Sequence, residues 1–215
     1  YRENPVLEMV KAGGWVMVPL LICSILALAI VFERAWALRR NKILPPHLVA
    51  QTWHQVKNNQ LDAAQIRNLR IGSPLGRVIA AGLVNLNQPR EIMLEAIEDT
   101  GRHEAHNLER FLNTLGTVAT VSPLLGLLGT VTGMIEIFNV VGLEGPGRAA
   151  GLAAGIGEAL ITTATGLIIA IPALVAYRYF RGKVDALVVD MEKEALKLVE
   201  VIHGQREREQ PENNA

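Results

Sequence analysis

The sequence lacks most of the features that enzymes and metal-binding modules need. Cys23 is the single cysteine, so no disulfide can form within the chain, and no cysteine–histidine spacing fits a metal site. His103 and His106 lie three residues apart, but as a metal pair they have no further obvious ligands. No phosphate-binding loop, hydrolase or metalloprotease motif is present. We therefore expect no metal, no cofactor and no enzymatic activity, and we interpret Cys23 as an apolar packing residue.

Charged residues are also missing from three long windows. These windows are residues 12–32, 111–135 and 159–177. A helix needs about 20 mostly apolar residues to cross a bilayer, and a soluble helix of that length normally keeps a polar face. The windows therefore predict three transmembrane helices, at residues 15–32, 111–138 and 158–177. A signal peptide is a poorer interpretation of the first window, because charged residues follow it as in a stop-transfer anchor.

Lysine and arginine near the ends of the spans are concentrated in residues 33–110 and after residue 177. The positive-inside rule places both segments in the cytoplasm. Residues 1–14 then form a short periplasmic segment with an interfacial helix, and residues 139–157 form a short periplasmic loop. Residues 178–204 are predicted to be a cytoplasmic helix, and residues 205–215 a disordered tail. The predicted fold class is an all-α membrane protein with three transmembrane helices, of which spans two and three extend into a cytoplasmic helical bundle.

The long cytoplasmic segment is predicted to fold into several helices, one of which starts at Ser73 as its N-cap with Pro74 in the first turn. After Pro89 no proline occurs before Pro123, so a single helix is predicted to run from Arg90 through the second span to Phe138. In the tail, apolar residues fall on one face of a helix continuing span three. This tail stripe consists of Val184, Val188, Met191, Ala195, Leu198 and Ile202. The stripe packs either against the helix of residues 90–110 or against a neighbouring subunit.

Small residues recur along the second span at spacings of three and four. Four of them, which we name the small-residue seam, are Ser122, Gly126, Gly129 and Gly133. Small residues let helix backbones approach closely in lipid, where apolar side chains give no driving force for association. We therefore predict that the seam packs against span three or the next subunit. Thr130 and Pro123 lie on a neighbouring face, where Pro123 is expected to kink the helix.

Span three has a line of polar residues. Glu158, Thr162, Thr165 and Pro172 share one face, and Thr163 lies one residue round. A carboxyl group at the entrance of a span with hydroxyls below it suggests a polar track, and Pro172 is expected to kink the helix. Two alternatives stay open. A membrane threonine often donates only to a carbonyl of its own helix, and Glu158 can be a solvated residue favoured by the helix dipole.

No Asp, Glu, Lys or Arg lies in the middle of any predicted span. Threonine hydroxyls can pass on a hydrogen bond, but they do not titrate near neutral pH. A proton path through these spans would therefore need a carboxylate from another chain. This absence predicts a hetero-oligomer with a partner helix beside the threonines.

The segments "SPLLGLLGTVTGMIEIF" and "GIGEALITTATGLIIAIPALVAY" resemble the MotA/TolQ/ExbB proton-channel family, and specifically its ExbB/TolQ branch. The resemblance implies a pentamer of this subunit around two single-span helices of an ExbD- or TolR-like partner that bears a membrane Asp. It maps the polar pore positions onto Thr130, Glu158 and Thr163, and Thr162 and Thr165 flank the last of these. It implies the channel subunit of a proton-driven motor in a bacterial inner membrane.

Two rival functions remain at this point. A solute transporter would show inverted repeats and broken helices near the midplane, which three spans with straight extensions do not match. A scaffold that holds a partner and conducts nothing would need only the small-residue seam. Proton flux in vesicles with the partner present distinguishes a scaffold from a channel.

Overall fold

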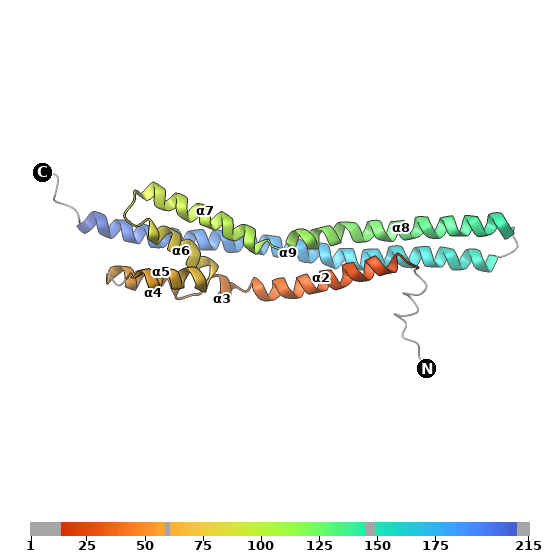
Figure 1. The fold of residues 1–215 in the computed structure, drawn as a ribbon, viewed down its shortest axis with the longest axis horizontal. Coiled ribbons are helices and arrows are strands. Elements are labelled where there is room, and N and C mark those ends of the chain that lie inside the picture. The colour runs from red at the N-terminus through yellow and green to blue at the C-terminus, as the bar shows by residue number, and fades with distance from the viewer. Residues whose placement is uncertain (1–13, 59–60, 145–148, 210–215) are drawn as a thin grey trace, which may run out of the picture. The chain divides into compact units, whose positions relative to one another are not determined.

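The computed structural model describes residues 14–58, 61–144 and 149–209, so the helix predicted within residues 1–14 lies almost wholly outside the described residues. Within these ranges every regular element is a helix (Figure 1). The helices are α2 (Met17–Ala37), α3 (Arg40–Ile43), α4 (Leu48–Lys57), α5 (Ala63–Gly72), α6 (Pro74–Val84), α7 (Arg90–Leu108), α8 (Leu112–Glu144) and α9 (Ala149–Glu209). The chain forms two compact units. The first consists of Tyr1–Arg34 with Phe111–Tyr179, and the second of Ala35–Arg110 with Phe180–Ala215.

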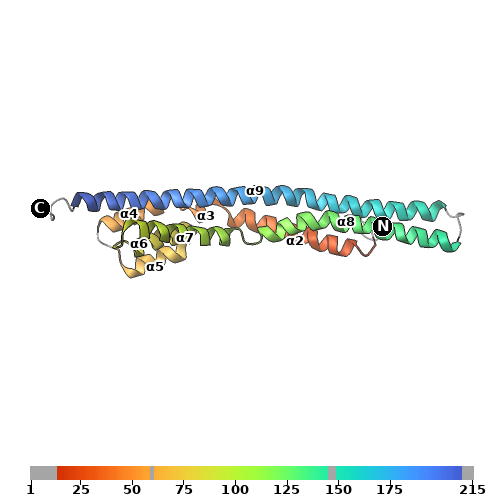
Figure 2. The same cartoon turned by 90° about the horizontal axis from the view of Figure 1, so that it is seen from above.

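The first unit contains the apolar helices. Among the described residues, α2, α8 and α9 are long and apolar enough to cross a membrane, which confirms the predicted all-α membrane class with three transmembrane helices. In this unit α8 runs antiparallel to α2 and to the first part of α9 (Figures 1 and 2). The three helices share a small core, in which Leu20 and its buried neighbours on α2 pack against Leu125 of α8 and Ile169 of α9.

The helices extend further than the sequence predicts. Residues 139–157 were expected to form a loop, but α8 continues to Glu144 and α9 begins at Ala149. The alanine-rich start of α9 favours helix, since alanine has the highest helix propensity. At its other end α9 continues to Glu209, although residues 205–215 were predicted to be disordered. Gln, Arg and Glu, which make up residues 205–209, are good helix formers, and the next proline is Pro211. Residues 210–215 lie outside the described part.

The prediction of one helix from Arg90 to Phe138 is wrong, because the chain breaks between α7 and α8. Phe111 has a φ of 67°, in the left-handed region that side chains other than glycine rarely adopt. The guanidinium of Arg34 is buried and lies over the Phe111 ring, with its central carbon 5.5 Å from the ring centroid. Arg34 also forms an ion pair with Glu33. The break is therefore accompanied by a contact between the end of α2 and the start of α8.

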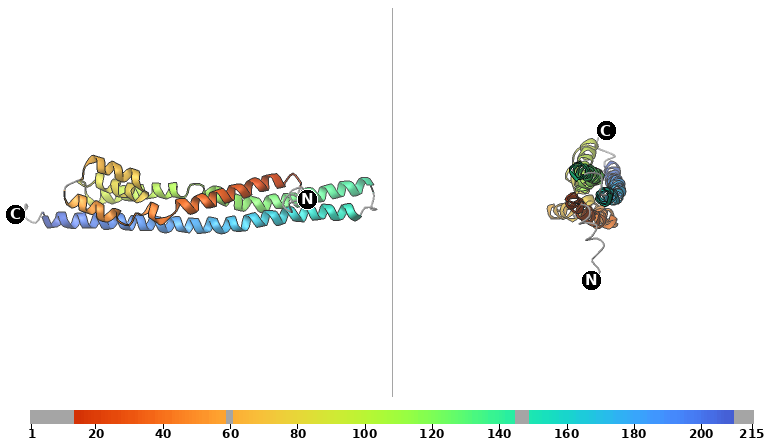
Figure 3. Two further views of the ribbon diagram at one scale, coloured as in Figure 1. Left: turned by 90° about the horizontal axis from the view of Figure 1, so that it is seen from below. Right: turned by 90° about the vertical axis from the view of Figure 1, so that its right-hand side faces the viewer.

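The second unit is a helical bundle with an apolar core. Ser73 caps α6 by accepting a hydrogen bond from the Gly76 amide at 3.0 Å, and Pro74 occupies the first turn, as predicted. Helices α4 to α7 lie along the C-terminal part of α9 (Figure 3). The tail stripe on α9 is buried, except for the half-buried Val188. A methyl group at Gly101 of α7 would lie 3.3 Å from Glu192 Oε1 of α9, so these helices are close and the chain itself covers this face.

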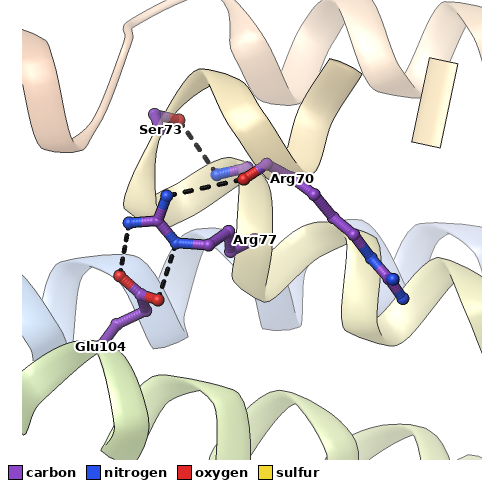
Figure 4. A network of polar contacts seen from close by, with 5 residues as sticks. Arg70, Ser73, Arg77 and Glu104 are labelled. Atoms are coloured by element: carbon purple, nitrogen blue, oxygen red, sulfur yellow. Dashed lines mark hydrogen bonds and ion pairs between the residues drawn. The ribbon is translucent and has the colours of Figure 1, made fainter. Parts of the chain in front are cut away.

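An ion pair between the partly exposed Arg77 and the buried Glu104 links α6 to α7 (Figure 4). Glu104 is only 2% exposed, and Arg77 donates to both of its carboxylate oxygens at 2.7 Å. The hydrogen bond from Arg77 to Glu104 raises the pKa of Arg77 above its usual value, although burial acts in the opposite direction. Arg77 Nη1 also donates to the Arg70 carbonyl on α5 at 3.5 Å. Three consecutive helices are thus joined around one buried carboxylate.

Candidate functional site

The small-residue seam brings the backbones of α8 and α9 into contact. A methyl group at Gly129 would lie 2.3 Å from Thr162 Oγ1, and one at Gly126 would lie 3.0 Å from the Thr162 carbonyl oxygen. At Gly133 the neighbour is Ala159 Cβ, at 3.2 Å. These separations leave little or no room for a side chain. The structure therefore places the seam against span three of the same chain.

Ser122 lies at the start of the seam and is fully buried. Its hydroxyl donates to the Val118 carbonyl at 2.7 Å, which satisfies the hydroxyl proton within α8. On the other helix, a methyl group at Gly166 would lie 2.6 Å from the Ser122 carbonyl oxygen. Glycine at 166 therefore permits the close approach that glycines 126 and 129 permit from the opposite side.

Thr162 belongs to this contact. It is only 1% exposed, and its hydroxyl donates to the Ala159 carbonyl at 2.8 Å, with a longer contact of 3.4 Å to the Gly126 carbonyl. Sequence spacing placed it on a polar track with Glu158 and Thr165. The structure instead places its side chain between α8 and α9, where it fills the space that Gly129 leaves.

Thr163 is half-buried and makes a different contact. Its hydroxyl donates to the Gly126 carbonyl of α8 at 3.0 Å, so it is a side chain that links the two helices by a hydrogen bond. Thr130, one turn beyond Gly126 on α8, donates to the Leu127 carbonyl at 2.6 Å and is also half-buried. The Thr130 hydroxyl thus lies about one helical turn along α8 from the carbonyl that Thr163 contacts.

Thr165 donates to the Ile161 carbonyl of its own helix at 2.8 Å. The hydroxyls of Thr165 and Thr130 thus donate to carbonyls of their own helices, as one of the two alternatives expected. The hydroxyl of Thr163 does not, because it donates to the neighbouring helix. Because each of these hydroxyls already donates its proton to a carbonyl, its oxygen can still accept a hydrogen bond. The site is therefore suited to accept hydrogen bonds from a donor such as water or a protonated carboxyl group.

Glu158 lines a pocket of about 250 Å³ in the first unit, beside the start of α2. The other polar residues of this pocket are Thr132, Glu136 and Asn139 of α8. Trp15 and Gly14, directly before α2, close another side. Gly14 has a φ of 65°, and a methyl group there would lie 2.5 Å from Glu158 Oε1. The chain can therefore turn into α2 directly beside this carboxylate.

Glu136 of α8 was not among the predicted site residues. The structure shows it exposed and on the same pocket as Glu158. The signal was present in the sequence, because Thr132, Glu136 and Asn139 are spaced by four and three residues and share one helix face. Which face of α9 they meet depends on how the helices pack, and this information is not contained in the spacing.

The two prolines lie within continuous helices, Pro123 in α8 and Pro172 in α9. Each lacks the amide proton that would bond to the carbonyl four residues earlier. Pro123 follows the buried Ser122 and is half-buried, whereas Pro172 is exposed. The helices continue through both positions (Figure 1), and a kink at either remains a prediction.

Comparison with known proteins identifies relatives for most of the chain. Residues 70–193 match the family model of the MotA/TolQ/ExbB proton channel family. The chain is 40% identical over 169 residues to the ExbB-like 1 protein of Synechocystis sp., in a match that covers 77% of this chain and 66% of that protein. It is 35% identical to the ExbB-like 3 protein of the same organism over 80% of this chain and 82% of the relative. The Tol-Pal system protein TolQ of Pseudomonas aeruginosa is 29% identical, over 80% of each chain.

Proposed function

Since this chain belongs to the MotA/TolQ/ExbB proton channel family, we propose that it is the channel subunit of a motor of the ExbB–ExbD or TolQ–TolR type, driven by the proton motive force. The motor lies in a bacterial inner membrane and energises transport across, or the integrity of, the outer membrane. The chain crosses the membrane three times, with its N-terminus in the periplasm and its C-terminus in the cytoplasm. The distribution of lysine and arginine beside the spans supports this orientation.

The observation that best supports the proposal is the hydrogen bond from Thr163 to the Gly126 carbonyl, with the Thr130 hydroxyl about one turn further along α8. It lies at the edge of the α8–α9 contact, in spans that have no titratable residue at their middle. The hydroxyls already donate to carbonyls, and their oxygens remain able to accept. A protonated carboxyl group on a partner helix would find acceptors here, and its ionised form would not. The site thus distinguishes two protonation states without titrating itself.

The partner that this chemistry requires is an ExbD- or TolR-like protein with one span and a membrane Asp. We propose that five copies of the chain surround two such helices, as the family resemblance implies. Large apolar residues of the spans are exposed on the single chain and are available for lipid or for neighbouring subunits. They include Leu124, Leu127, Val131, Leu160, Ile168 and Ile171.

The pocket around Glu158 is proposed as the outer entrance to the proton pathway. Two carboxylates from different helices lie at one opening, and a negative field at an opening raises the local concentration of cations, including protons. Thr162, which fills the α8–α9 contact, and Thr165 are proposed to support the wall of the pathway between this entrance and Thr163.

The test is proton flux into proteoliposomes, followed with a pH-sensitive dye under an imposed gradient. The chain would be purified alone, with its single-span partner, and with a partner whose membrane Asp is replaced by Asn. We expect flux only with the unmodified partner. A complex that assembles at the same stoichiometry but conducts no protons with any partner would instead support the scaffold. Flux from the chain alone would contradict the need for a partner carboxylate.

A further inference from the structure

The chain leaves α2 through an exposed aromatic and basic segment that the proposed proton pathway does not use. Trp36 lies in the last turn of this apolar helix and is 61% exposed. The ammonium nitrogen of Lys42 lies 2.9 Å from the centroid of the Trp36 ring. This contact is a cation–π interaction, which holds the lysine charge against the face of the indole.

The backbone of this segment is fixed by buried apolar side chains. Leu38 and Ile43 are almost completely buried in the second unit, on either side of Arg39, Arg40 and Lys42, whose side chains are exposed. Arg40 also forms an ion pair with Asp190 of α9 at 2.9 Å. The basic side chains therefore project from an anchored turn, and little ordering is needed before they bind a ligand.

The charge of the segment is of one sign. No Asp or Glu occurs in the sequence between Glu33 and Asp62, whereas Arg39, Arg40 and Lys42 lie within four residues of one another. The segment directly follows a helix long and apolar enough to cross a membrane. Tryptophan at the end of such a helix favours the level of the lipid headgroups, where its ring contacts acyl chains and its N–H stays in polar surroundings.

We propose that Trp36, Arg39 and Lys42 form a binding site for the headgroup of an anionic phospholipid on the cytoplasmic face of the membrane. The phosphate accepts charge-assisted hydrogen bonds from the ammonium and the guanidinium. The exposed indole packs against the glycerol and upper acyl chains of the same lipid. A soluble phosphate would use only the charges and would leave the indole in water, so the exposed ring favours a lipid as the occupant. This site is independent of whether the chain conducts protons.

The experiment uses the full chain in nanodiscs made from equal parts phosphatidylcholine and phosphatidylglycerol. Native mass spectrometry of the released protein counts each lipid that stays bound. We expect retention of phosphatidylglycerol in preference to phosphatidylcholine. Lys42→Gln should weaken phosphatidylglycerol binding about five-fold, and Arg39→Gln with Lys42→Gln about 25-fold, at about 1 kcal/mol for each basic residue. Trp36→Leu should weaken binding although it leaves every charge in place, and Lys42→Arg should retain it.

Lys57→Gln is the matched control, because Lys57 is an exposed lysine at the end of α4, away from Trp36 in the sequence. We expect it to bind phosphatidylglycerol as the unchanged protein does. An equal loss in Lys57→Gln would overturn the proposal, because binding would then depend on total charge alone. Unchanged binding in the double variant would also overturn it, as would displacement of the lipid by millimolar inorganic phosphate. Each variant is first checked for an unchanged thermal midpoint in phosphatidylcholine alone, and if the double variant unfolds, Lys42→Gln and Trp36→Leu decide the question.

Discussion

The two halves of α9 are buried by different kinds of side chain. In the first unit the buried residues are small, namely Ala159, Thr162, Gly166, Ala170 and Ala173. In the second unit they are mostly large and apolar, namely Phe180, Val184, Leu187, Met191, Ala195, Leu198, Val199 and Ile202. One continuous helix thus contains two packing patterns, and the change occurs around the basic residues that follow span three.

The difference follows from the solvent. In water, removing a large apolar side chain from solvent stabilises a contact by roughly 1.5 to 3 kcal/mol. In lipid that gain is absent, so helices associate through close backbone packing and hydrogen bonds. The first unit accordingly has the glycine contacts and the Thr163–Gly126 hydrogen bond, while the second has an apolar core and the Arg77–Glu104 pair. The contrast supports the assignment of only the first unit to the membrane.

The largest effect is expected from filling the contact in the first unit. Gly166→Ala places a methyl group 2.6 Å from the Ser122 carbonyl oxygen, which is backbone and cannot move aside as a side chain can. We expect a loss of about 3 kcal/mol in the free energy of unfolding, measured by denaturation in detergent. Gly157→Ala is the control, because no atom lies within 4 Å of its added methyl group. Equal stability in the two variants would show that the seam is not close-packed.

In the second unit, Glu104→Ala should lower the free energy of unfolding by about 2 kcal/mol. The loss of a buried pair is usually larger, but Arg77 is more than one-third exposed, and water can solvate it when its partner is removed. Thermal unfolding measures the change. Glu98→Ala, which removes an exposed i,i+4 pair with Arg102, should lower the stability much less, because water and salt screen that pair. If both substitutions cost the same, burial of Glu104 contributes nothing.

The raised pKa of Arg77 predicts the pH range over which its ion pair with Glu104 stabilises the fold. The pKa of Arg77 is raised in the folded chain, so its contribution to stability is complete below the unfolded pKa and declines only as the pH rises through the folded value. That range lies in strong alkali. The difference in unfolding free energy between Arg77→Leu and the unchanged chain should therefore stay constant from neutral pH to about pH 10 as far as Arg77 titrates.

Removing the hydroxyl of Thr163 in the first unit should lower proton flux, whereas removing that of Thr52 in the second unit should not. Thr163→Val removes the hydrogen bond to Gly126 and one acceptor, and we expect proton flux to fall about five-fold, the equivalent of about 1 kcal/mol, with the complex still assembled. Thr163→Ser should restore flux. Thr52, a buried threonine of α4 that donates to the Leu48 carbonyl, is the control, and Thr52→Val should leave flux unchanged. Full flux in Thr163→Val would remove its hydroxyl from the pathway.

The smallest effect is expected at the entrance. Glu158→Gln should lower proton flux about three-fold, because one of two carboxylates at the pocket is lost, and Glu136→Gln should lower it less. Both should respond to ionic strength in the same vesicle assay. Unchanged flux in Glu158→Gln would mean that Glu158 lines the pocket without contributing to conduction, since α9 begins nine residues earlier, at Ala149, too far for a helix-start role.

The sequence predicts the three spans because charge-free windows of membrane length are rare in soluble helices, which keep a polar face. It also predicts the seam, since small residues at spacings of three and four share a face. It does not separate Thr162 from Thr163, because one residue turns the side chain by about 100° and the packing of α9 on α8 decides which one is covered. The break at Phe111 is not predictable either, since residues 109–111 include neither proline nor glycine and the contact with Arg34 is tertiary.

Position 111 shows two opposing demands on a single residue. Glycine would adopt the left-handed backbone without the strain of about 1 to 3 kcal/mol that another residue stores there, but it would remove the ring beneath Arg34. Any other aromatic residue would keep the ring and the strain together. A substitution at Phe111 that relieves the backbone strain therefore also removes the cation–π contact with Arg34. A random library at this codon should enrich aromatic residues where Arg34 is present, and glycine or asparagine where Arg34 has been replaced by leucine.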